Sequence, residues 1–269
     1  MGSIANSPAE ILYATDFCEA AGHALKFAKK VARLRGCAVR AIHVIDLSGP
    51  AGGVYASYAA AYDVAVRRLR ALRRELRLSG IPRSATLITS GAPARAIRDA
   101  AFRYQSGMIV LGLFGESDVL TTSLGRVARS ILRRAQCPVL TVGPGSPETD
   151  SPDFKRVFYI TDISPDSLLA ATHVWPAQFD HLATRPRAVL PAPKDAEKLP
   201  PANASLSAPF LPIEHHNAGA TLLAEAASSN ADLIVLGVRS GGYLDVFHAG
   251  SVPNALISRA TCPVLTVRC

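Results

Sequence analysis

The 269-residue sequence lacks the features that mark membrane, secreted and metal-binding proteins. It has no stretch of the roughly 18 apolar residues that a transmembrane helix needs. Its first residues contain neither the basic segment nor the apolar core of a secretion signal. The cysteines show no CxxC spacing, which argues against a zinc site and against a disulfide framework. These absences favour a cytoplasmic protein without a metal site. The five cysteines are Cys18, Cys37, Cys137, Cys262 and Cys269.

Acidic residues are outnumbered by basic ones, so the formal net charge is +8. Such a balance favours acidic partners, among them nucleotides, nucleic acid and anionic lipid. Six of the basic residues are arginines between positions 67 and 77, which stand among Leu69, Leu72 and Leu76. Leucines three and four residues apart predict one apolar stripe of a helix, with the arginines on its solvent side. No aromatic residue is interleaved to stack on bases, so a solvated helix face is favoured over a nucleic-acid surface.

A composition that is 49% hydrophobic and 19% charged is typical of a globular protein with a sizeable core. Three ordered matches between the two halves of the sequence indicate a duplication. Two matches are separated by 125 positions and the third by 146. Cys137 and Cys262 each precede the same Pro-Val-Leu-Thr-Val strand, which predicts two small buried side chains. The matching segments are 108–112 with 233–237, 137–142 with 262–267, and 12–16 with 158–162.

The change of separation shows that the second copy has lost about 21 residues from its middle, since Asp16 to Gly112 spans 96 positions and Asp162 to Gly237 spans 75. Prolines are dense between residues 185 and 212, which excludes the long helix that the first copy has there. A Gly/Pro/Ser-rich linker at 143–152 separates the copies. The predicted domains are therefore residues 1–146 and a shortened second domain, residues 147–269.

Short β-branched segments alternate with helical patterns along the first copy, which predicts an α/β fold with a doubly wound, mainly parallel sheet. The second copy repeats this order with a shortened first helix and without the second. Strands that are apolar throughout fit a sheet buried on both faces. The predicted strands of the first copy lie near 10–15, 38–45, 85–89, 108–112 and 138–142, and its helices near 19–35, 56–79, 93–105 and 123–135.

Candidate binding residues collect at the carboxyl ends of these strands, where open parallel sheets bind ligands. Thr15 and Asp16 end the first strand, Val44 ends the second, and three glycines follow the fourth. Glycines let a backbone approach a phosphate closely, and helix starts attract anions. The spacing matches neither a Walker A loop nor GxGxxG. Two other interpretations stay open: the aspartates as helix N-caps, and the glycines as ordinary turn residues. The glycines are Gly112, Gly115 and Gly125.

The same glycines, followed by Cys137-Pro-Val-Leu-Thr-Val, resemble the nucleotide loop and final strand of the universal stress protein family, and residues 11–16 and 41–46 resemble its first two strands. The resemblance implies a tandem member with a regulatory role in the stress response. It also implies a bound ATP or other adenine nucleotide, with or without Mg²⁺. The residues it assigns to the nucleotide are Ala14, Thr15, Asp16, Val44, Gly112, Gly115, Gly125, Arg126 and Val127 in the first copy, and Asp162, Gly237, Gly250, Ser251 and Val252 in the second.

Both copies depart from the family's pattern, in which a serine or threonine follows the last glycine. Arg126 stands at that position in the first copy, where it could pair with a phosphate or close the site. In the second copy Gly250 and Ser251 are intact, but Ser240 replaces the second glycine. The first copy is therefore the better candidate site. The alternative is a scaffold of the same fold that binds no nucleotide and holds an acidic partner through its Arg-rich helix.

The resemblance also implies that the last strands of the two copies pair with each other, forming an intramolecular pseudo-dimer. Residues 139–142 and 264–267 are the candidates, and their pairing would cover two exposed strand edges. Further association into homodimers and an unidentified protein partner stay open. No catalytic triad, nucleophile elbow or metal-ligand spacing is present in the sequence. We therefore expect binding without dedicated catalytic machinery, and at most slow hydrolysis of ATP.

Overall fold

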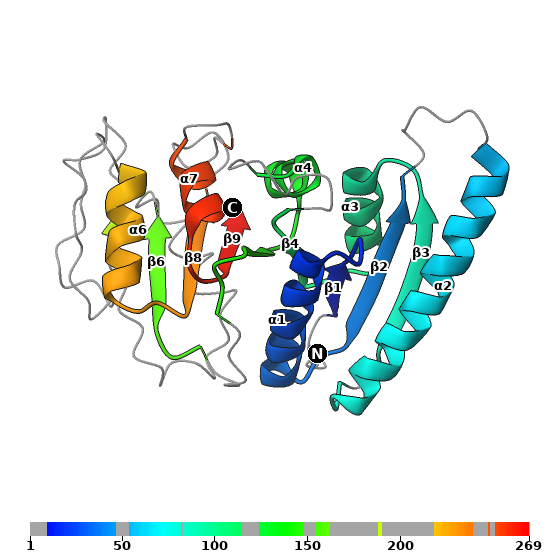
Figure 1. Ribbon diagram of the computed structural model, residues 1–269. Coiled ribbons are helices and arrows are strands. Elements are labelled where there is room, and N and C mark those ends of the chain that lie inside the picture. Colours follow the sequence, from blue (N-terminus) through cyan, green and yellow to red (C-terminus); the bar gives the residue numbers. More distant parts are fainter. Residues whose placement is uncertain are drawn as a thin grey trace, which may run out of the picture. The chain divides into compact units, whose positions relative to one another are not determined.

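The computed structural model describes residues 10–46, 54–81, 83–114, 124–147, 154–161, 188–189, 218–238, 247 and 251–268 (Figure 1). Two compact units are distinguished by their internal contacts: Met1–Val119 with Gly125–Cys137, and Leu120–Leu124 with Pro138–Cys269. The last strand of the first copy thus belongs to the second unit. The domain boundary between residues 146 and 147 follows the sequence repeat and stays a prediction.

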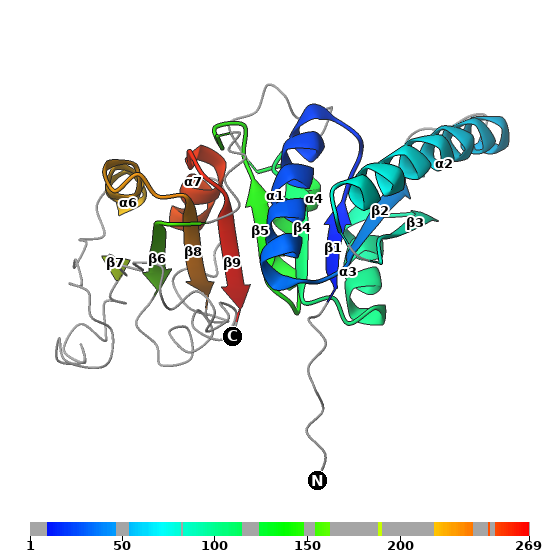
Figure 2. The same ribbon diagram turned by 90° about the horizontal axis from the view of Figure 1, so that it is seen from below.

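The first unit contains a parallel four-stranded sheet in the order β3-β2-β1-β4. Strands β1 and β4 are almost wholly buried, because helices cover both faces of the sheet (Figures 1 and 2). This arrangement confirms the predicted α/β class and each predicted strand of this sheet to within about two residues. The strands are β1 (Ile11–Ala14), β2 (Val39–Ile45), β3 (Ala85–Ser90) and β4 (Met108–Gly112).

Four helices connect the strands, and the reversal of strand order after β3 divides them between the two faces. Right-handed crossovers place α1 and α2 on one face and α3 and α4 on the other (Figure 1). Helix α3 packs against α4 as well as against β2 and β3. The helices are α1 (Glu19–Arg35), α2 (Val54–Leu78), α3 (Pro93–Arg103) and α4 (Arg126–Arg134).

Helix α2 has the predicted amphipathic character. Leu69, Leu72 and Leu76 are buried against the sheet, whereas the six arginines between residues 67 and 77 are exposed. The Lys29 ammonium on α1 pairs with Glu75 on α2, which ties the two neighbouring helices together at their surface. The arginine face is therefore a solvated surface of α2.

The second unit has a five-stranded sheet in the order β5-β9-β8-β6-β7. All neighbours are parallel except β5 and β9. Helices α6 and α7 pack against each other. The predicted shortening of the first helix and loss of the second concern residues outside the described ranges. The elements are β5 (Val139–Val142), β6 (Val157–Thr161), β7 (Ala188–Val189), α6 (Ala218–Ser228), β8 (Leu233–Val238), α7 (Val252–Arg259) and β9 (Val264–Arg268).

Strands β5 and β9 pair antiparallel, which confirms the predicted pairing of the two final strands. Leu140 lies opposite Leu265, its own counterpart 125 positions later, and the flanking residues pair as Val139 with Thr266 and Thr141 with Val264. Val264 is the counterpart of Val139, and Thr266 is the counterpart of Thr141, so the two flanking pairs are equivalent. The ladder therefore has a local two-fold symmetry centred on the two leucines.

The cysteines fit the predicted burial only in part. Cys37 and Cys262 are buried and act as small apolar side chains, whereas Cys137 is only half-buried, so the prediction for it was wrong. No cluster of three metal-ligating side chains occurs among the residues that the structure describes. Within the same residues, no helix combines the length and apolarity needed to cross a bilayer.

Candidate functional site

A cavity of about 290 Å³ lies in the first unit at the carboxyl ends of β1, β2 and β4. The starts of α3 and α4 close its remaining side. The sheet order reverses here, since β1 pairs with β2 on one side and with β4 on the other. Strands diverge to opposite crossovers at such a point and leave a crevice, which is the usual ligand position in open α/β sheets.

The cavity brings together every described residue that the sequence assigned to the first nucleotide site, while Gly115 lies outside the described ranges. These residues come from four separate segments of the chain, and only the fold places them side by side. The assigned residues that line the cavity are Ala14, Thr15, Asp16, Val44, Gly112, Gly125, Arg126 and Val127.

Several other lining residues were missed by the sequence analysis. Asp46 lines the cavity directly after β2. It ends the Ala-Ile-His-Val-Ile-Asp segment that resembles the family's second strand, but it was not assigned to the site from the sequence. Pro93 and Ile97, from the first turns of α3, gave no sequence signal, because only the packing of α3 beside α4 brings them to the cavity.

The loop between β1 and α1 is fixed by hydrogen bonds from its own side chains. The Thr15 hydroxyl accepts from the Phe17 N–H at 2.9 Å, and an Asp16 carboxylate oxygen accepts from the Cys18 N–H at 3.0 Å. Cys18 is the N-cap of α1, and its sulfur accepts from the Ala21 N–H at 3.5 Å. The interpretation of Asp16 as the helix N-cap was therefore wrong. Its carboxylate orders the loop and stays exposed beside the cavity.

A second set of contacts holds this loop from the side of α2. Phe17 has a φ of 65°, in the left-handed region, and its ring lies 4.6 Å from the His43 ring. The Arg68 guanidinium on α2 lies over the Phe17 ring, 5.3 Å from the ring centroid. His43 Nδ1 is 2.9 Å from the Thr15 carbonyl oxygen, which can only accept, so this nitrogen carries the proton. The loop next to Asp16 is thus anchored before any ligand arrives.

Gly112 has a structural reason to be glycine. A Cβ at this position would lie 2.7 Å from the carbonyl carbon of Ala20 and 2.8 Å from its oxygen, both in the first turn of α1. The Tyr13 hydroxyl also binds this turn, donating to the Ala21 carbonyl at 2.6 Å, and burial raises the Tyr13 pKa well above its ordinary value. The close approach of β4 to α1 therefore accounts for this glycine without a ligand.

The start of α4 has no side-chain cap for its first backbone N–H groups. Its N-cap is Gly125, which has no side chain to accept from the first N–H groups, and Arg126 follows as an exposed side chain. Uncapped N–H groups and the helix dipole together favour a negative charge at this position. The cavity is therefore bordered by the Asp16 and Asp46 carboxylates on the strand side and by cationic groups at α4.

The second copy uses its corresponding residues differently. Ser251 is the N-cap of α7, and its hydroxyl accepts from the Asn254 N–H at 3.3 Å. Val252 is buried in the first turn of α7, and Gly237 lies inside β8 opposite Val267. The predicted residues Asp162 and Gly250 lie outside the described ranges.

The sequence and the fold were compared with known proteins. The model of the universal stress protein family matches residues 9–143 and again residues 156–268. A universal stress protein of Thermus aquaticus is 31% identical over 134 residues, which cover 49% of this chain and 96% of that protein. One from Methanocaldococcus jannaschii is 30% identical over 129 residues, covering 46% of this chain and 73% of that protein.

Among solved structures, a universal stress protein from Archaeoglobus fulgidus matches 97% of this chain and 96% of its own, with a TM-score of 0.77 at 17% identity. That likeness shows the fold over both copies. Two matches to one family model, in the order of the repeat, agree with the duplication found in the sequence. The chain belongs to the universal stress protein family, as a tandem member with two copies of the family's domain.

Proposed function

We propose that the first unit binds an adenine nucleotide of the ATP class and that the bound state regulates the protein's response to stress. The observation that carries this proposal is the convergence of the predicted residues on one cavity. The strand order explains why strand ends meet at the cavity. It does not by itself require that the residues assigned from the sequence line the same cavity, as Val44, Gly112 and Arg126 do.

The volume of the cavity fits the enclosed part of a nucleotide. About 290 Å³ is at the lower end of ligand pockets, so the cavity would take the nucleoside and leave the phosphates at its opening. Ala14, Val44 and Ile97 offer apolar surface for the base. The exposed Asp16 carboxylate would accept hydrogen bonds from ribose hydroxyl groups, because one of its oxygens is not needed for the loop.

The phosphates would lie at the start of α4. Gly125 supplies no cap, so backbone N–H groups there would bind phosphate oxygens directly. Arg126 would add a bidentate contact. Mg²⁺ would enter with the phosphates. No cluster of protein ligands within the described residues offers a separate metal position. The proposed use of the bound nucleotide is regulation.

The proposal is tested by the nucleotide that the purified protein carries. Protein is denatured by heat and the supernatant is analysed by chromatography and mass spectrometry, and emptied protein is titrated with ATP, ADP and cAMP, with and without Mg²⁺. One universal stress protein has been determined in complex with cAMP, so the cyclic nucleotide belongs in the set. We expect near-stoichiometric adenine nucleotide or a thermal shift with ATP. If no nucleotide is released and ATP gives no thermal shift, the proposal is wrong.

Two variants connect binding to the cavity. Asp16→Asn keeps an oxygen for the Cys18 N–H and removes the charge, so the loop should persist while affinity falls by about tenfold. Gly112→Val is unsuitable, since its side chain would displace α1 whether or not a ligand binds.

Arg126→Ser restores the family's residue and separates the two roles of Arg126: weaker binding means a phosphate contact, and tighter binding means obstruction. Arg133→Ser, exposed on the same helix, is the control.

A second candidate is a scaffold without nucleotide, favoured by the exposed arginine at the start of α4 and by the six exposed arginines of α2. In that case the affinity for an acidic partner would fall steeply with salt and would depend on α2, while Asp16→Asn would have no effect.

A further inference from the structure

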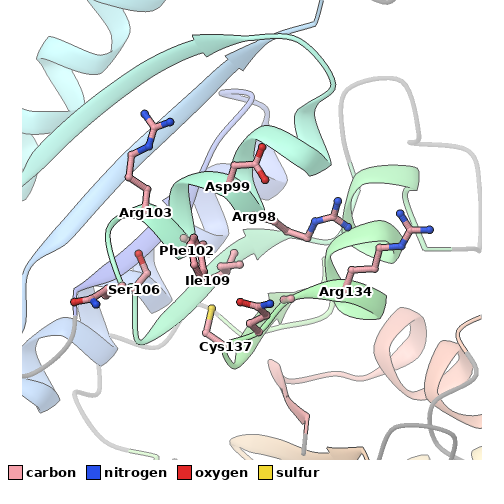
Figure 3. A pocket seen from close by; sticks show the side chains of 12 residues that line it. Arg98, Asp99, Phe102, Arg103, Ser106, Ile109, Arg134 and Cys137 are labelled. Carbon is pink, nitrogen blue, oxygen red and sulfur yellow. The ribbon is translucent and has the colours of Figure 1, made fainter.

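A second cavity lies in the first unit at the opposite end of the strands from the candidate nucleotide site. It has a volume of about 1110 Å³ and lies where α3 and α4 end and β4 begins. Figure 3 shows Phe102 and Ile109 in its middle, with Arg103 on one side and Arg98 and Arg134 on the other. Ile109 is fully buried and forms an apolar floor, whereas Phe102 is 75% exposed.

The second copy is an internal control for this surface, because α6 and β8 repeat the backbone of α3 and β4. The turns have the same form: Gln105 has a φ of 48° and Asn230 a φ of 49°. The Ser106 N–H donates to the Ala101 carbonyl at 2.9 Å, and the counterpart of Ser106, Ala231, donates to Ala226 at 2.9 Å. The two copies therefore differ here in side chains and not in backbone.

Some of the residues that line the cavity are the same in both copies, while others are not. Ala101, Ile109, Ala135 and Cys137 correspond, 125 positions later, to the same residue types. Arg134 also has a counterpart, Arg259, and both complement the negative end of a helix. The lining residues without a similar counterpart are Arg98, Asp99, Phe102, Arg103, Ser106 and Gln136, whose positions are occupied by Leu223, Ala224, Ala227, Ser228, Ala231 and Thr261. The turn and strand form without this second set.

Ser106 adds an independent observation. It is 6% exposed and lines the cavity, and its hydroxyl oxygen is buried without a hydrogen-bond partner. A buried hydroxyl without a partner costs about 1–3 kcal/mol, and the same backbone accepts alanine at position 231. The hydroxyl is thus unused by the fold and available to a group that enters the cavity.

The charges at the cavity define the partner's chemistry. Three arginines and one carboxylate, Asp99, line it, and Asp99 already lies 3.6 Å from Arg95 on the same helix. Arg98 donates to the Ser130 carbonyl at 3.3 Å, and that bond leaves its other donors for a ligand. Exposed aromatic rings beside arginines are typical of protein interfaces. A second copy of this chain is disfavoured as the occupant by its net charge of +8.

We propose that this cavity docks an acidic peptide segment of a partner protein, which packs an apolar side chain against Phe102 over Ile109 and pairs its carboxylates with Arg98, Arg103 and Arg134. The Ser106 hydroxyl donates to a carbonyl or carboxylate oxygen of the same segment. This surface gives the first unit a protein-binding function that is separate from its nucleotide site and that the second copy lacks.

The test begins with a random peptide library displayed on phage. The full chain is the selection target, and the chain with Phe102→Ala, Arg103→Ser and Ser106→Ala is used to remove peptides that bind elsewhere. These changes install the second copy's residues, so the backbone should keep its form, which the thermal unfolding midpoint checks. We expect the surviving peptides to be enriched in Asp and Glu around an aromatic or aliphatic residue. Survivors without an acidic excess would overturn the proposal.

One enriched peptide, labelled with fluorescein, then measures the single variants by anisotropy. Phe102→Ala should weaken binding by about tenfold or more, and Arg103→Ser by about threefold to tenfold. The effect of Arg103→Ser should shrink as salt is added. Arg74→Ser on α2, which removes an exposed arginine elsewhere, is the charge-matched control. Equal losses from Arg74→Ser and Arg103→Ser would reduce the result to general charge attraction and contradict the proposal.

A measurement on the unaltered chain keeps the test valid even if the variants are unstable. Cys137 lines the cavity and is half-buried, so a bound peptide should slow its alkylation by iodoacetamide. Cys18, in the candidate nucleotide site's loop, should keep its rate. Tryptic mapping by mass spectrometry reads both cysteines in one sample. Unchanged alkylation of Cys137 at saturating peptide would exclude this cavity as the docking site.

Discussion

The helices before the two final strands end alike but begin differently. Helix α4 ends at Arg134 with Ala135 as its C-cap, and α7 ends at the counterparts Arg259 and Ala260 with nearly the same backbone angles. At its start α4 has a glycine N-cap and no side-chain hydrogen bond, whereas α7 is capped by the hydroxyl of Ser251. The end that leads into the shared β5–β9 ladder is the same in both copies, while the N-cap at the start of the helix differs. The fold therefore constrains the end of this repeated helix that precedes the final strand more tightly than it constrains the start of the helix.

The largest expected effect breaks the first copy alone, at Gly112. Gly112→Ala places a Cβ within 2.8 Å of the Ala20 carbonyl group, so α1 must shift, and we expect the free energy of unfolding to fall by about 2–3 kcal/mol. Gly22→Ala, near the start of α1 where a Cβ meets nothing within 4 Å, should raise it by about 0.5–1 kcal/mol. Urea unfolding followed by circular dichroism measures both. Similar small effects at the two glycines would show that β4 does not approach α1 this closely.

The next effect compares two equivalent threonines in the β5–β9 ladder. The Thr141 hydroxyl donates to the Val264 carbonyl at 3.1 Å, whereas the hydroxyl of its counterpart Thr266 is buried without a partner. Thr141→Val should therefore cost about 1 kcal/mol, and Thr266→Val should stabilise the protein by a similar amount. Thermal unfolding of both variants and of the double variant checks this. Equal destabilisation by both substitutions would mean that both hydroxyl groups are hydrogen-bonded, which contradicts the prediction.

A third effect sharpens the difference at the helix starts. Ser251→Ala removes the cap of α7 and should lower the free energy of unfolding by about 1 kcal/mol. Arg126→Ala, at the corresponding position of the first copy, removes only an exposed side chain and should change it by less than about 0.5 kcal/mol. Chemical denaturation of the two variants, prepared without nucleotide, gives the values. A loss as large at Arg126 would mean that this arginine supports α4 and is not reserved for a ligand.

The last comparison concerns the two cysteines before the final strands. Burial raises the pKa of Cys137 to about 11 and that of Cys262 to about 12. Both thiols should therefore be alkylated more slowly than in the unfolded chain at pH 8, with Cys137 reacting before Cys262 because it is half-buried. The folded state holds these protons to a higher pH than the unfolded state does. Stability should consequently fall as the pH rises from about 9 towards 11 and 12. Mass spectrometry of alkylated peptides and unfolding at several pH values test the two statements.

Much of the fold could be predicted because local patterns of apolar residues determine its helices and strands. The leucine spacing of α2 and the apolar run of β4 each have one clear interpretation, and the repeat fixed the order of the elements in both copies. The N-cap of α1 was missed because the chain makes a turn first: Phe17 adopts a left-handed conformation, so the cap falls on Cys18 and not on Asp16.

The sites were less predictable, because they depend on packing between helices and strands that are distant in the chain. The sequence could assign Gly112 to the site, yet the reason for this glycine is the backbone of α1, which is distant in the chain. The cavity at the ends of α3 and α4 gave no motif at all. Aligning the copies at the 125-residue separation would have revealed it, since Phe102 and Arg103 stand opposite Ala227 and Ser228 in otherwise similar helices.

The symmetry of the β5–β9 ladder has a consequence for how such a chain is assembled and how it arose. A strand that meets its own duplicate residue for residue is self-complementary, so before the duplication two separate chains could join through the same strand. Fusion of the two genes makes that association intramolecular and independent of protein concentration. The same self-complementarity leaves a hazard during synthesis: until β9 emerges from the ribosome, β5 of one nascent chain matches β5 of its neighbour, and the polysome becomes a place where strands can be exchanged.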